Sequence, residues 1–106
     1  MFVGDARKRM QAFPRDVQRD AGHGLLELQE GNEPSDVKAL VDMPTGIKEL
    51  RLWDESGTFR VVFVAKFEEA VYVLHAFQKK TQSTSPKDLK LVRQRYEEVR
   101  AFRGQI

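Results

Sequence analysis

The sequence predicts an α+β fold: two N-terminal helices packed on a twisted antiparallel β-sheet, followed by a C-terminal helix. Three observations predict this fold. Apolar residues recur at helical spacing in the first third of the chain and again after residue 85. Between these segments, residues 47–78 contain three runs rich in Val, Phe and Tyr, which favour strands. The connections between the runs are short and polar, as in antiparallel hairpins.

The first third of the chain predicts two helices. Asp5 can cap a short helix that runs through Met10 and Phe13. Pro14 stands where a second helix prefers its first residue, and Gly31 is suited to end that helix. The second helix has an apolar stripe at helical spacing, formed by Val17, Ala21, Leu25 and Leu28.

Two glycines interrupt this second helix. Gly22 and Gly24 each weaken it by up to about 1 kcal/mol relative to alanine. A close crossing with another element would explain why glycine stands at these positions.

The middle of the chain predicts three main strands, at residues 47–53, 58–66 and 70–78. The apolar piece 37–41 lies between turn-forming residues and is a candidate for a short additional strand. Polar turns at residues 54–57 and 67–69 are expected to join the main strands as hairpins.

Residues 85–104 predict the last helix. Ser85 is its expected N-cap and Pro86 its first residue, and Asp88 replaces the usual Glu or Gln of a capping box. Gly104 is expected to end the helix. Its apolar stripe consists of Leu89, Val92, Tyr96 and Val99.

Composition narrows the classes of function. The 106 residues are enough for one domain, which we expect to span residues 1–106, and 41% of them are hydrophobic and 32% charged. No run approaches the roughly 20 apolar residues of a membrane span, and the N-terminus lacks a signal sequence. The absence of cysteine excludes disulfides and thiolate sites, and two histidines leave little material for a metal cluster. We expect a cytoplasmic domain without metal or cofactor.

The charge is unevenly distributed along the chain. The formal net charge is +2, but residues 75–106 hold eight Lys and Arg against three acids, whereas residues 1–74 hold ten against thirteen. This asymmetry indicates a surface suited to polyanions such as nucleic acid. A solvated helix face is the alternative explanation.

Hairpin geometry predicts which strand residues face one another. If the first hairpin turns at residues 55–56, Arg51 lies opposite Arg60. If the second turns at residues 68–69, Arg60 lies opposite Phe77. One face of the sheet, expected to form the core against the N-terminal helices, then carries Leu50, Leu52, Phe59, Val61, Phe63, Tyr72, Leu74 and Ala76. The other face carries Glu49, Arg51, Trp53, Arg60, Val62, Val64, Val73, His75 and Phe77.

Directly opposed arginines are unfavourable on a sheet, so their presence needs a reason. Glu49 could neutralise the pair, or the pair could bind an anion. The second explanation gains support because two Arg, one His, two Lys and two aromatic residues converge at one end of this face. Guanidinium groups suit phosphate oxygens, and aromatic rings suit unpaired bases. A three-residue first turn would instead separate the arginines.

One segment is similar to a known family. Residues 71–81 read Val-Tyr-Val-Leu-His-Ala-Phe-Gln-Lys-Lys-Thr, followed by Pro86 and then by Arg93-Gln94-Arg95. The segment resembles the phage-derived Gp49-like, or HigB-like, toxins of the RelE/ParE superfamily. The strand sequences at 48–51 and 59–62, and the Phe-Pro pair at 13–14, agree in order, so that the resemblance covers nearly the whole chain. Relative to the family the chain begins late, and a short leading segment is expected to be missing.

The resemblance implies the toxin of a type II toxin–antitoxin system with a microbial-ribonuclease-like fold. Toxins of the RelE branch are metal-independent endoribonucleases that cut mRNA, typically in the ribosomal A site. The implied partner is a small antitoxin, commonly a HigA-like helix-turn-helix protein, which alone contacts operator DNA. Two alternatives share the fold: a ParE-like DNA gyrase poison, and an inactive member that only binds RNA or protein.

The resemblance also implies roles for individual residues. Cleavage by the 2′-OH needs a proton acceptor, a proton donor and positive charge on the phosphorane oxygens. Arg51 and Arg60 match the strand arginines that hold the phosphate, and Lys79 and Lys80 match the basic loop of the family. His75 is a further catalytic candidate. Its alternative is a sheet histidine that packs locally, because some superfamily members work with Arg, Lys and Tyr alone.

Other residues are assigned to RNA binding or to packing. Phe77, Trp53 and Gln82 are candidate RNA-binding residues, although Phe77 could equally fill space and Trp53 could contact the antitoxin or its own helix. Tyr96 is expected in the core, and His23 is expected in solvent.

Overall fold

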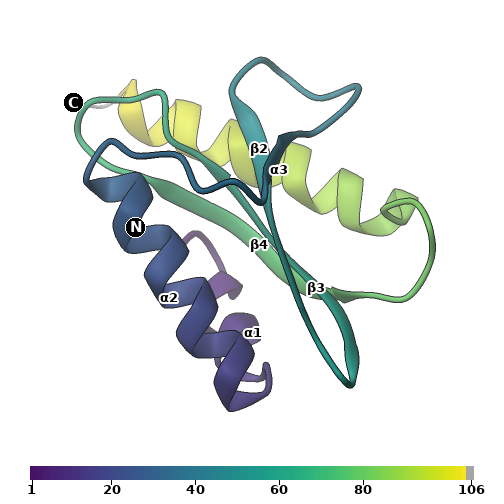
Figure 1. The fold of residues 1–106 in the computed structure, drawn as a ribbon. Helices are drawn as coiled ribbons and strands as arrows, with labels where there is room; N and C mark the ends of the chain where they lie inside the picture. The colour runs from purple at the N-terminus through teal and green to yellow at the C-terminus, as the bar shows by residue number, and fades with distance from the viewer. Residues whose placement is uncertain (105–106) are drawn as a thin grey trace.

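The computed structural model describes residues 1–104 and has the α+β architecture that the sequence predicts (Figure 1). A four-stranded antiparallel meander with strand order β1-β2-β3-β4 stands between two helical layers. The elements are α1 (Ala6–Gln11), α2 (Arg15–Gln29), β1 (Val37–Ala39), β2 (Ile47–Asp54), β3 (Gly57–Val64), β4 (Tyr72–Lys79) and α3 (Pro86–Arg103).

The sheet buries both of its faces. α1 and α2 cover one face and α3 covers the other, as Figure 1 shows. Val61 and Val62 are neighbours in β3, yet each belongs to a different core cluster and neither is exposed. Because both faces of β3 are covered, its second half is continuously apolar instead of alternating. None of the helices within residues 1–104 has the length and hydrophobicity needed to cross a membrane.

The first hairpin closes on two residues, as predicted. Asp54 pairs with Gly57, and Oδ1 of Asp54 accepts hydrogen bonds from the backbone N–H of Ser56 at 2.8 Å and from its hydroxyl at 2.6 Å. Gly57 has a φ of +138°, a conformation that glycine adopts without a steric penalty. The turn therefore sets the register in which Arg51 lies opposite Arg60.

The second connection differs from the prediction of a tight turn at residues 68–69. β3 ends at Val64 and β4 begins at Tyr72, so that residues 65–71 form a longer loop. The predicted register holds beyond the loop, with Arg60 opposite Phe77. Nearer to the loop the register shifts by one residue. Val62 pairs with His75 and Phe63 pairs with Val73, so that Leu74 has no partner on β3. This irregularity is a β-bulge.

The bulge corrects the predicted sheet faces. Tyr72 and Leu74 were expected under the N-terminal helices, but they pack with the residues of α3. Val73 was expected on the arginine face, but it packs with α1 and α2. The predicted register holds from His75 onward. A one-residue change of register moves the side chains on the N-terminal side of this point to the other face, which explains why these three predictions are wrong.

The helix ends follow the sequence in part. Ser85 is the N-cap of α3 and accepts a hydrogen bond from the backbone N–H of Asp88 at 3.2 Å, and Gly104 is the C-cap. Asp5 precedes α1, but its carboxylate caps no backbone N–H and binds Arg9 and Arg95 instead. Pro14 is the N-cap of α2 and not its first residue.

Gly24 and Gly22 have different surroundings in α2. A Cβ atom at Gly24 would lie 2.6 Å from Cδ2 of Leu50, whereas a Cβ atom at Gly22 would meet nothing within 4 Å. The close crossing that the glycines indicated therefore occurs at Gly24, where α2 approaches β2.

These surroundings predict opposite effects of the same substitution. We expect Gly22→Ala to stabilise the protein by up to about 1 kcal/mol, because alanine favours the helix and no atom obstructs its methyl group. We expect Gly24→Ala to destabilise it by about 1 kcal/mol, because Leu50 must leave its position in a packed core. Urea unfolding of the two variants measures the difference. Equal stabilisation by both would show that α2 does not press on Leu50.

Candidate functional site

The candidate residues lie on one face of the sheet in three cross-strand rows. Strand pairing places them in register across β2, β3 and β4, with side chains of one row pointing to the same face. The rows are Glu49–Val62–His75, then Arg51–Arg60–Phe77, then Trp53–Thr58–Lys79. The structure therefore brings together most of the residues that the sequence singled out.

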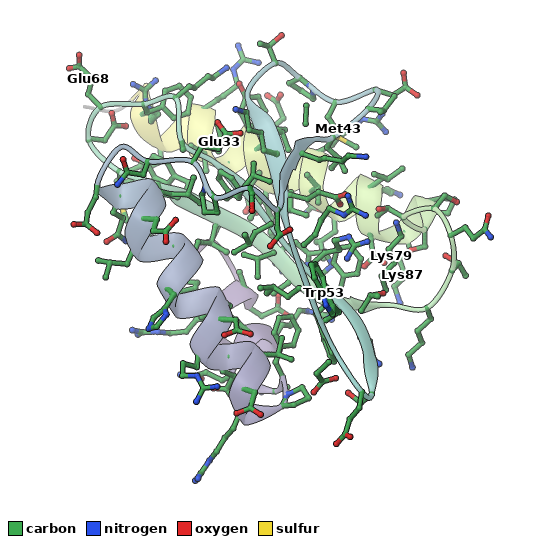
Figure 2. The ribbon with its side chains drawn as sticks, in the orientation of Figure 1. Glu33, Met43, Trp53, Glu68, Lys79 and Lys87 are labelled. Atoms are coloured by element: carbon green, nitrogen blue, oxygen red, sulfur yellow. The ribbon has the colours of Figure 1, made fainter. Side chains whose placement is uncertain are left out.

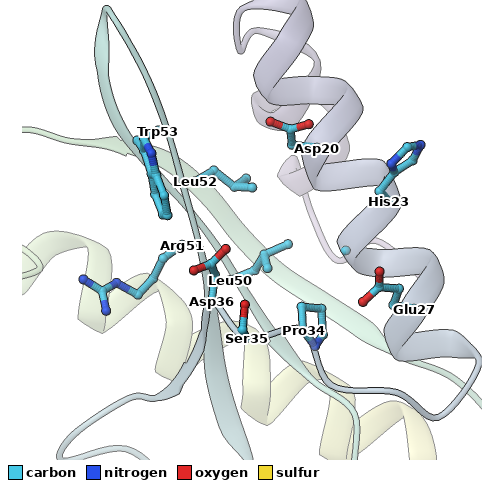
Figure 3. A pocket seen from close by; sticks show the side chains of 11 residues that line it. Asp20, His23, Glu27, Pro34, Ser35, Asp36, Leu50, Arg51, Leu52 and Trp53 are labelled. Atoms are coloured by element: carbon cyan, nitrogen blue, oxygen red, sulfur yellow. The ribbon is translucent and has the colours of Figure 1, made fainter.

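Arg51 and Arg60 form the closest kind of cross-strand pair. The backbone N–H of Arg51 donates to the carbonyl oxygen of Asp36 at 3.0 Å, on the side of β2 away from β3. The two arginines are therefore a non-hydrogen-bonded pair, in which Cα atoms of antiparallel strands are about 4.5 Å apart. Figure 3 shows Arg51 pointing away from α2, on the opposite side of β2 from Leu50 and Leu52.

The two arginines have different surroundings. Arg51 is half-buried and makes no ion pair with any residue in the range 1–104. Arg60 is only 5% exposed, and its Nε lies 3.6 Å from Oε2 of Glu49, which is also buried. Its Nη1 donates to the carbonyl oxygen of Phe59 at 3.1 Å. Of the two explanations for the opposed arginines, the structure shows neutralisation by Glu49 at Arg60 but not at Arg51.

The electrostatics of Arg60 follow from this burial. Desolvation lowers the pKa of Arg60 below its ordinary value, Glu49 opposes this shift, and the neighbouring Arg51 adds to it. A guanidinium group keeps its charge in proteins even so. The region around the arginine pair therefore holds two positive charges and one negative charge.

His75 is fully buried beneath α3. Its Nε2 lies 2.7 Å from Oδ1 of Asp88, and its ring stacks on Phe77 with centroids 5.0 Å apart. Burial lowers the pKa of His75 more than the hydrogen bond and charge of Asp88 raise it. The imidazole is therefore neutral at pH 7, and its Nε2–H donates to Asp88. This arrangement matches the alternative of a locally packed sheet histidine, and its catalytic role stays a prediction.

Asp88 is the site residue that sequence reasoning missed. It had a predicted role only as a helix-capping residue, yet its carboxylate also accepts a hydrogen bond from the hydroxyl of Ser85 at 2.7 Å. Burial raises the pKa of Asp88, but the hydrogen bonds from His75 and Ser85 outweigh burial and leave it lowered. Asp88 thus ties the start of α3 to the middle of β4. Thirteen residues separate it from His75, and no sequence motif signals such a contact.

The remaining candidates lie at one end of the sheet. Trp53 is 59% exposed and Lys79 half-buried, and both lie in the third row (Figure 2). Lys80 follows the end of β4 and is exposed, as is Gln82 on the connection to α3. Phe77 is 9% exposed, which favours its packing role over stacking on a base.

Two further predictions concern residues outside the rows. Tyr96 belongs to α3 and is buried in the core, where its hydroxyl accepts a hydrogen bond from Nζ of Lys66 at 3.0 Å. His23 is exposed on α2. Both placements agree with the sequence analysis. Across residues 1–104, no three His, Asp or Glu side chains are arranged to hold a metal ion.

Three buried polar atoms of the candidate site lack a hydrogen-bond partner among the described residues. They are Oε2 of Glu49, Nε of Arg60 and Nδ1 of His75. A buried polar atom without a partner costs about 1–3 kcal/mol, and native proteins contain few of them. Their concentration in two neighbouring rows marks this region as one whose sequence is not optimised for stability alone.

The ion pair predicts a large asymmetry between single and double substitutions. Arg60→Ala should destabilise the protein by about 3 kcal/mol, because it leaves the carboxylate of Glu49 buried without a counter-charge. The double variant Glu49→Leu with Arg60→Met should unfold within about 1 kcal/mol of the wild type, because it removes both charges and keeps the volume. Urea unfolding tests both variants. A double variant that loses as much stability as Arg60→Ala, or more, would contradict the pairing.

The buried histidine predicts that stability depends on pH. The pKa of His75 is lowered in the folded state, so the unfolded chain takes up a proton first as the pH falls below about 6.5. Stability from this residue is therefore complete above pH 6.5 and decreases below it. Urea unfolding on both sides of that pH should show the decrease in the wild type and a smaller one in His75→Gln. Identical pH profiles would show that His75 is not the group responsible.

The family comparison agrees with the resemblance found in the strand motif. The model of the family described as phage-derived protein Gp49-like (DUF891) matches residues 8–97, which include every row of the candidate site. A comparison with curated proteins finds no match. The Gp49-like family is consistent with the toxin of a toxin–antitoxin system, which implies an antitoxin as partner. Because the match covers most of the chain, the protein belongs to the Gp49-like family of phage-derived proteins.

Proposed function

We propose that this protein is a toxin that cleaves mRNA in the ribosome by a metal-independent reaction, and that a helix-turn-helix antitoxin of the HigA kind inhibits it. The observation that carries the proposal is that Arg51 and Arg60 form a non-hydrogen-bonded cross-strand pair, on a face of the sheet that also carries Lys79. The repulsion between two directly opposed arginines destabilises a sheet, and binding of a negatively charged phosphodiester between them would offset this destabilisation.

The arrangement suits the charge requirements of RNA cleavage. When the 2′-oxygen attacks the adjacent phosphorus, its proton passes to a base and negative charge develops on the phosphorane oxygens. The P–O5′ bond then breaks as the 5′-oxygen takes up a proton, which leaves a 2′,3′-cyclic phosphate and a free 5′-OH. Arg51 has no carboxylate partner within residues 1–104, so its guanidinium is free to bind the phosphate in a bidentate manner. The ammonium group of Lys79 or Lys80 is the candidate proton donor to the leaving oxygen.

Arg60 has a supporting role in this proposal. Its side chain is held by Glu49 and the carbonyl oxygen of Phe59, so it does not reach outward as Arg51 does. Its charge nevertheless lies in the row of Arg51, where low dielectric strengthens electrostatic interactions. Arg60 therefore adds positive potential behind the group that contacts the phosphate.

The overall charge supports action within the ribosome. A net charge of +2 is modest for a nuclease that must capture free RNA through phosphate contacts alone. The ribosome would instead position the mRNA, so that the protein needs only a local cluster of positive charge. We also propose that operator DNA is bound only through the antitoxin, and that the toxin acts in the cytoplasm.

One observation favours a second candidate function, an inactive member that only binds RNA. Arg60 is 5% exposed and His75 is fully buried, so that two of the five predicted catalytic residues face no substrate in this conformation. An exposed Trp53 and the neighbouring lysines would still bind RNA.

Mapping of mRNA 5′ ends in a translating extract tests the proposal. The wild-type protein should produce new ends within codons, and Arg51→Ala should lower the cleavage rate by on the order of 10²–10³ while the protein stays folded. Lys48→Ala is the matched control, because Lys48 lies on the same strand but is paired with Glu33. Its cleavage rate should match the wild type.

Other results would contradict the nuclease. Intact mRNA together with blocked DNA supercoiling would indicate a gyrase poison of the ParE kind. Intact mRNA with retained RNA binding would indicate the inactive member. Equal cleavage rates of the wild type and Arg51→Ala would show that the arginine pair takes no part in cleavage.

A further inference from the structure

A cleft lies at the end of β4 and extends over the face opposite to the arginine pair, where Phe59 and Ala76 line it. It has a volume of about 500 Å³ and is formed between α1, the end of β4 and the start of α3. Apolar groups of Phe59, Ala76 and Leu91 line it. The volume falls in the range of small-ligand sites, and a single nucleotide fits it. Phe77 and Lys80 in its lining were candidates in the sequence analysis, whereas Arg9 and Lys87 were not.

Three basic side chains from three different segments line this cleft. Arg9 comes from α1, Lys80 follows β4, and Lys87 lies in the first turn of α3, and all three are exposed. Lys80 and Lys87 form no ion pair with any residue in the described part of the chain. Arg9 binds Asp5 at 2.8 Å, but this carboxylate is shared with Arg95.

The carboxylate in the lining of the cleft does not cancel this charge. Asp88 is already engaged by Nε2 of His75 and by the hydroxyl of Ser85. The cleft therefore has an excess of positive charge above an apolar floor, which is the combination that binds a phosphate together with a base.

A smaller cleft connects this site to the face that carries Arg51. It has a volume of about 220 Å³ and is lined by Lys79 and by residues of the connection to α3. The two clefts share Phe77, Gln78, Lys80 and Asp88. Figure 2 shows Lys79 and Lys87 near each other in this view, at the end of β4 and the start of α3. The two clefts therefore adjoin at the end of β4, where Lys79 and Lys80 lie.

We propose that the larger cleft binds a nucleotide of the RNA strand that flanks the phosphodiester held at Arg51. In this proposal Arg9 and Lys87 contact phosphates of the flanking segment. Lys80 lines both clefts and contacts the RNA where the strand passes from the larger cleft to the smaller one, which Lys79 lines. The inference rests on the proposed function in taking RNA as the ligand. An RNA strand is favoured over an acidic protein segment because the cleft joins an apolar floor to the surface of the arginine pair.

Binding of cleavage-resistant RNA tests this site without requiring catalysis. The probes are fluorescein-labelled 2′-O-methyl RNAs, one a dinucleotide and one of about ten nucleotides, a typical length for a single-strand binding site. Fluorescence anisotropy over a range of salt concentrations gives the dissociation constant and its salt dependence. The variants are Arg9→Gln and Lys87→Gln, and the control is Lys38→Gln, an exposed lysine on β1 at the opposite edge of the sheet.

The longer RNA should bind more weakly to Arg9→Gln and to Lys87→Gln than to the wild type. Each variant should also reduce the slope of log affinity against log salt by about 0.7, the value for one lost phosphate contact on a single strand. The dinucleotide should bind all proteins alike, because it occupies only the surface at Arg51. Lys38→Gln should bind both probes as the wild type does.

Several results would overturn the site. One is a slope of log affinity against log salt that is the same in both variants as in the wild type. Another is a loss of affinity in Lys38→Gln equal to that in the two variants. A third is displacement of the RNA by a polyglutamate peptide that carries the same charge. Circular dichroism melting of each variant separates loss of the site from loss of the fold. Cleavage is scored separately, so that weaker RNA binding by Lys87→Gln in a protein that leaves mRNA intact would support the site and overturn the nuclease.

Discussion

The register of β2 on β3 is the constraint on which the candidate site depends. Side chains alternate between the faces of a strand, so a slip of one residue would turn Arg51 toward α2 and place Leu52 on the arginine face. The turn at Asp54 prevents this slip, because its carboxylate holds Ser56 and Gly57 adopts a positive φ. The repulsion between Arg51 and Arg60 is thus imposed by a turn whose own hydrogen bonds are satisfied.

A second constraint, the bulge in β4, determines how α3 is attached. The leftover residue lets Tyr72 and Leu74 face α3, while Val73 faces the N-terminal helices. His75 remains in register with Val62 and meets Asp88 at the start of α3. The histidine contact therefore fixes the helix start at the end of the sheet where the lysines gather, and so acts on the site through the position of α3.

The sequence predicted the features that depend on local chemistry. The first turn, the Ser85 cap and the opposition of the arginines all follow from a few neighbouring residues. The bulge was not predictable, because residues 71–77 are apolar on both faces and carry no alternation that fixes a register. The contacts of Asp5 with Arg95 and of His75 with Asp88 join residues that local patterns do not connect. The burial of Arg60 was not predictable either, because it depends on how the elements packed on the sheet cover this side chain.

The positive charges of the site divide into two kinds with different physical roles. Arg60 is desolvated and paired, so its charge is fixed in place and little screened by salt. Arg51, Lys79 and Lys80 are partly or fully exposed, so their interactions with a polyanion weaken as salt rises. Under the proposed function, such a site would bind RNA through the exposed charges and orient it against the buried one. Because Glu49 pairs with this buried charge, the proposal implies that Glu49 sets the electrostatic potential behind Arg51 without itself binding RNA.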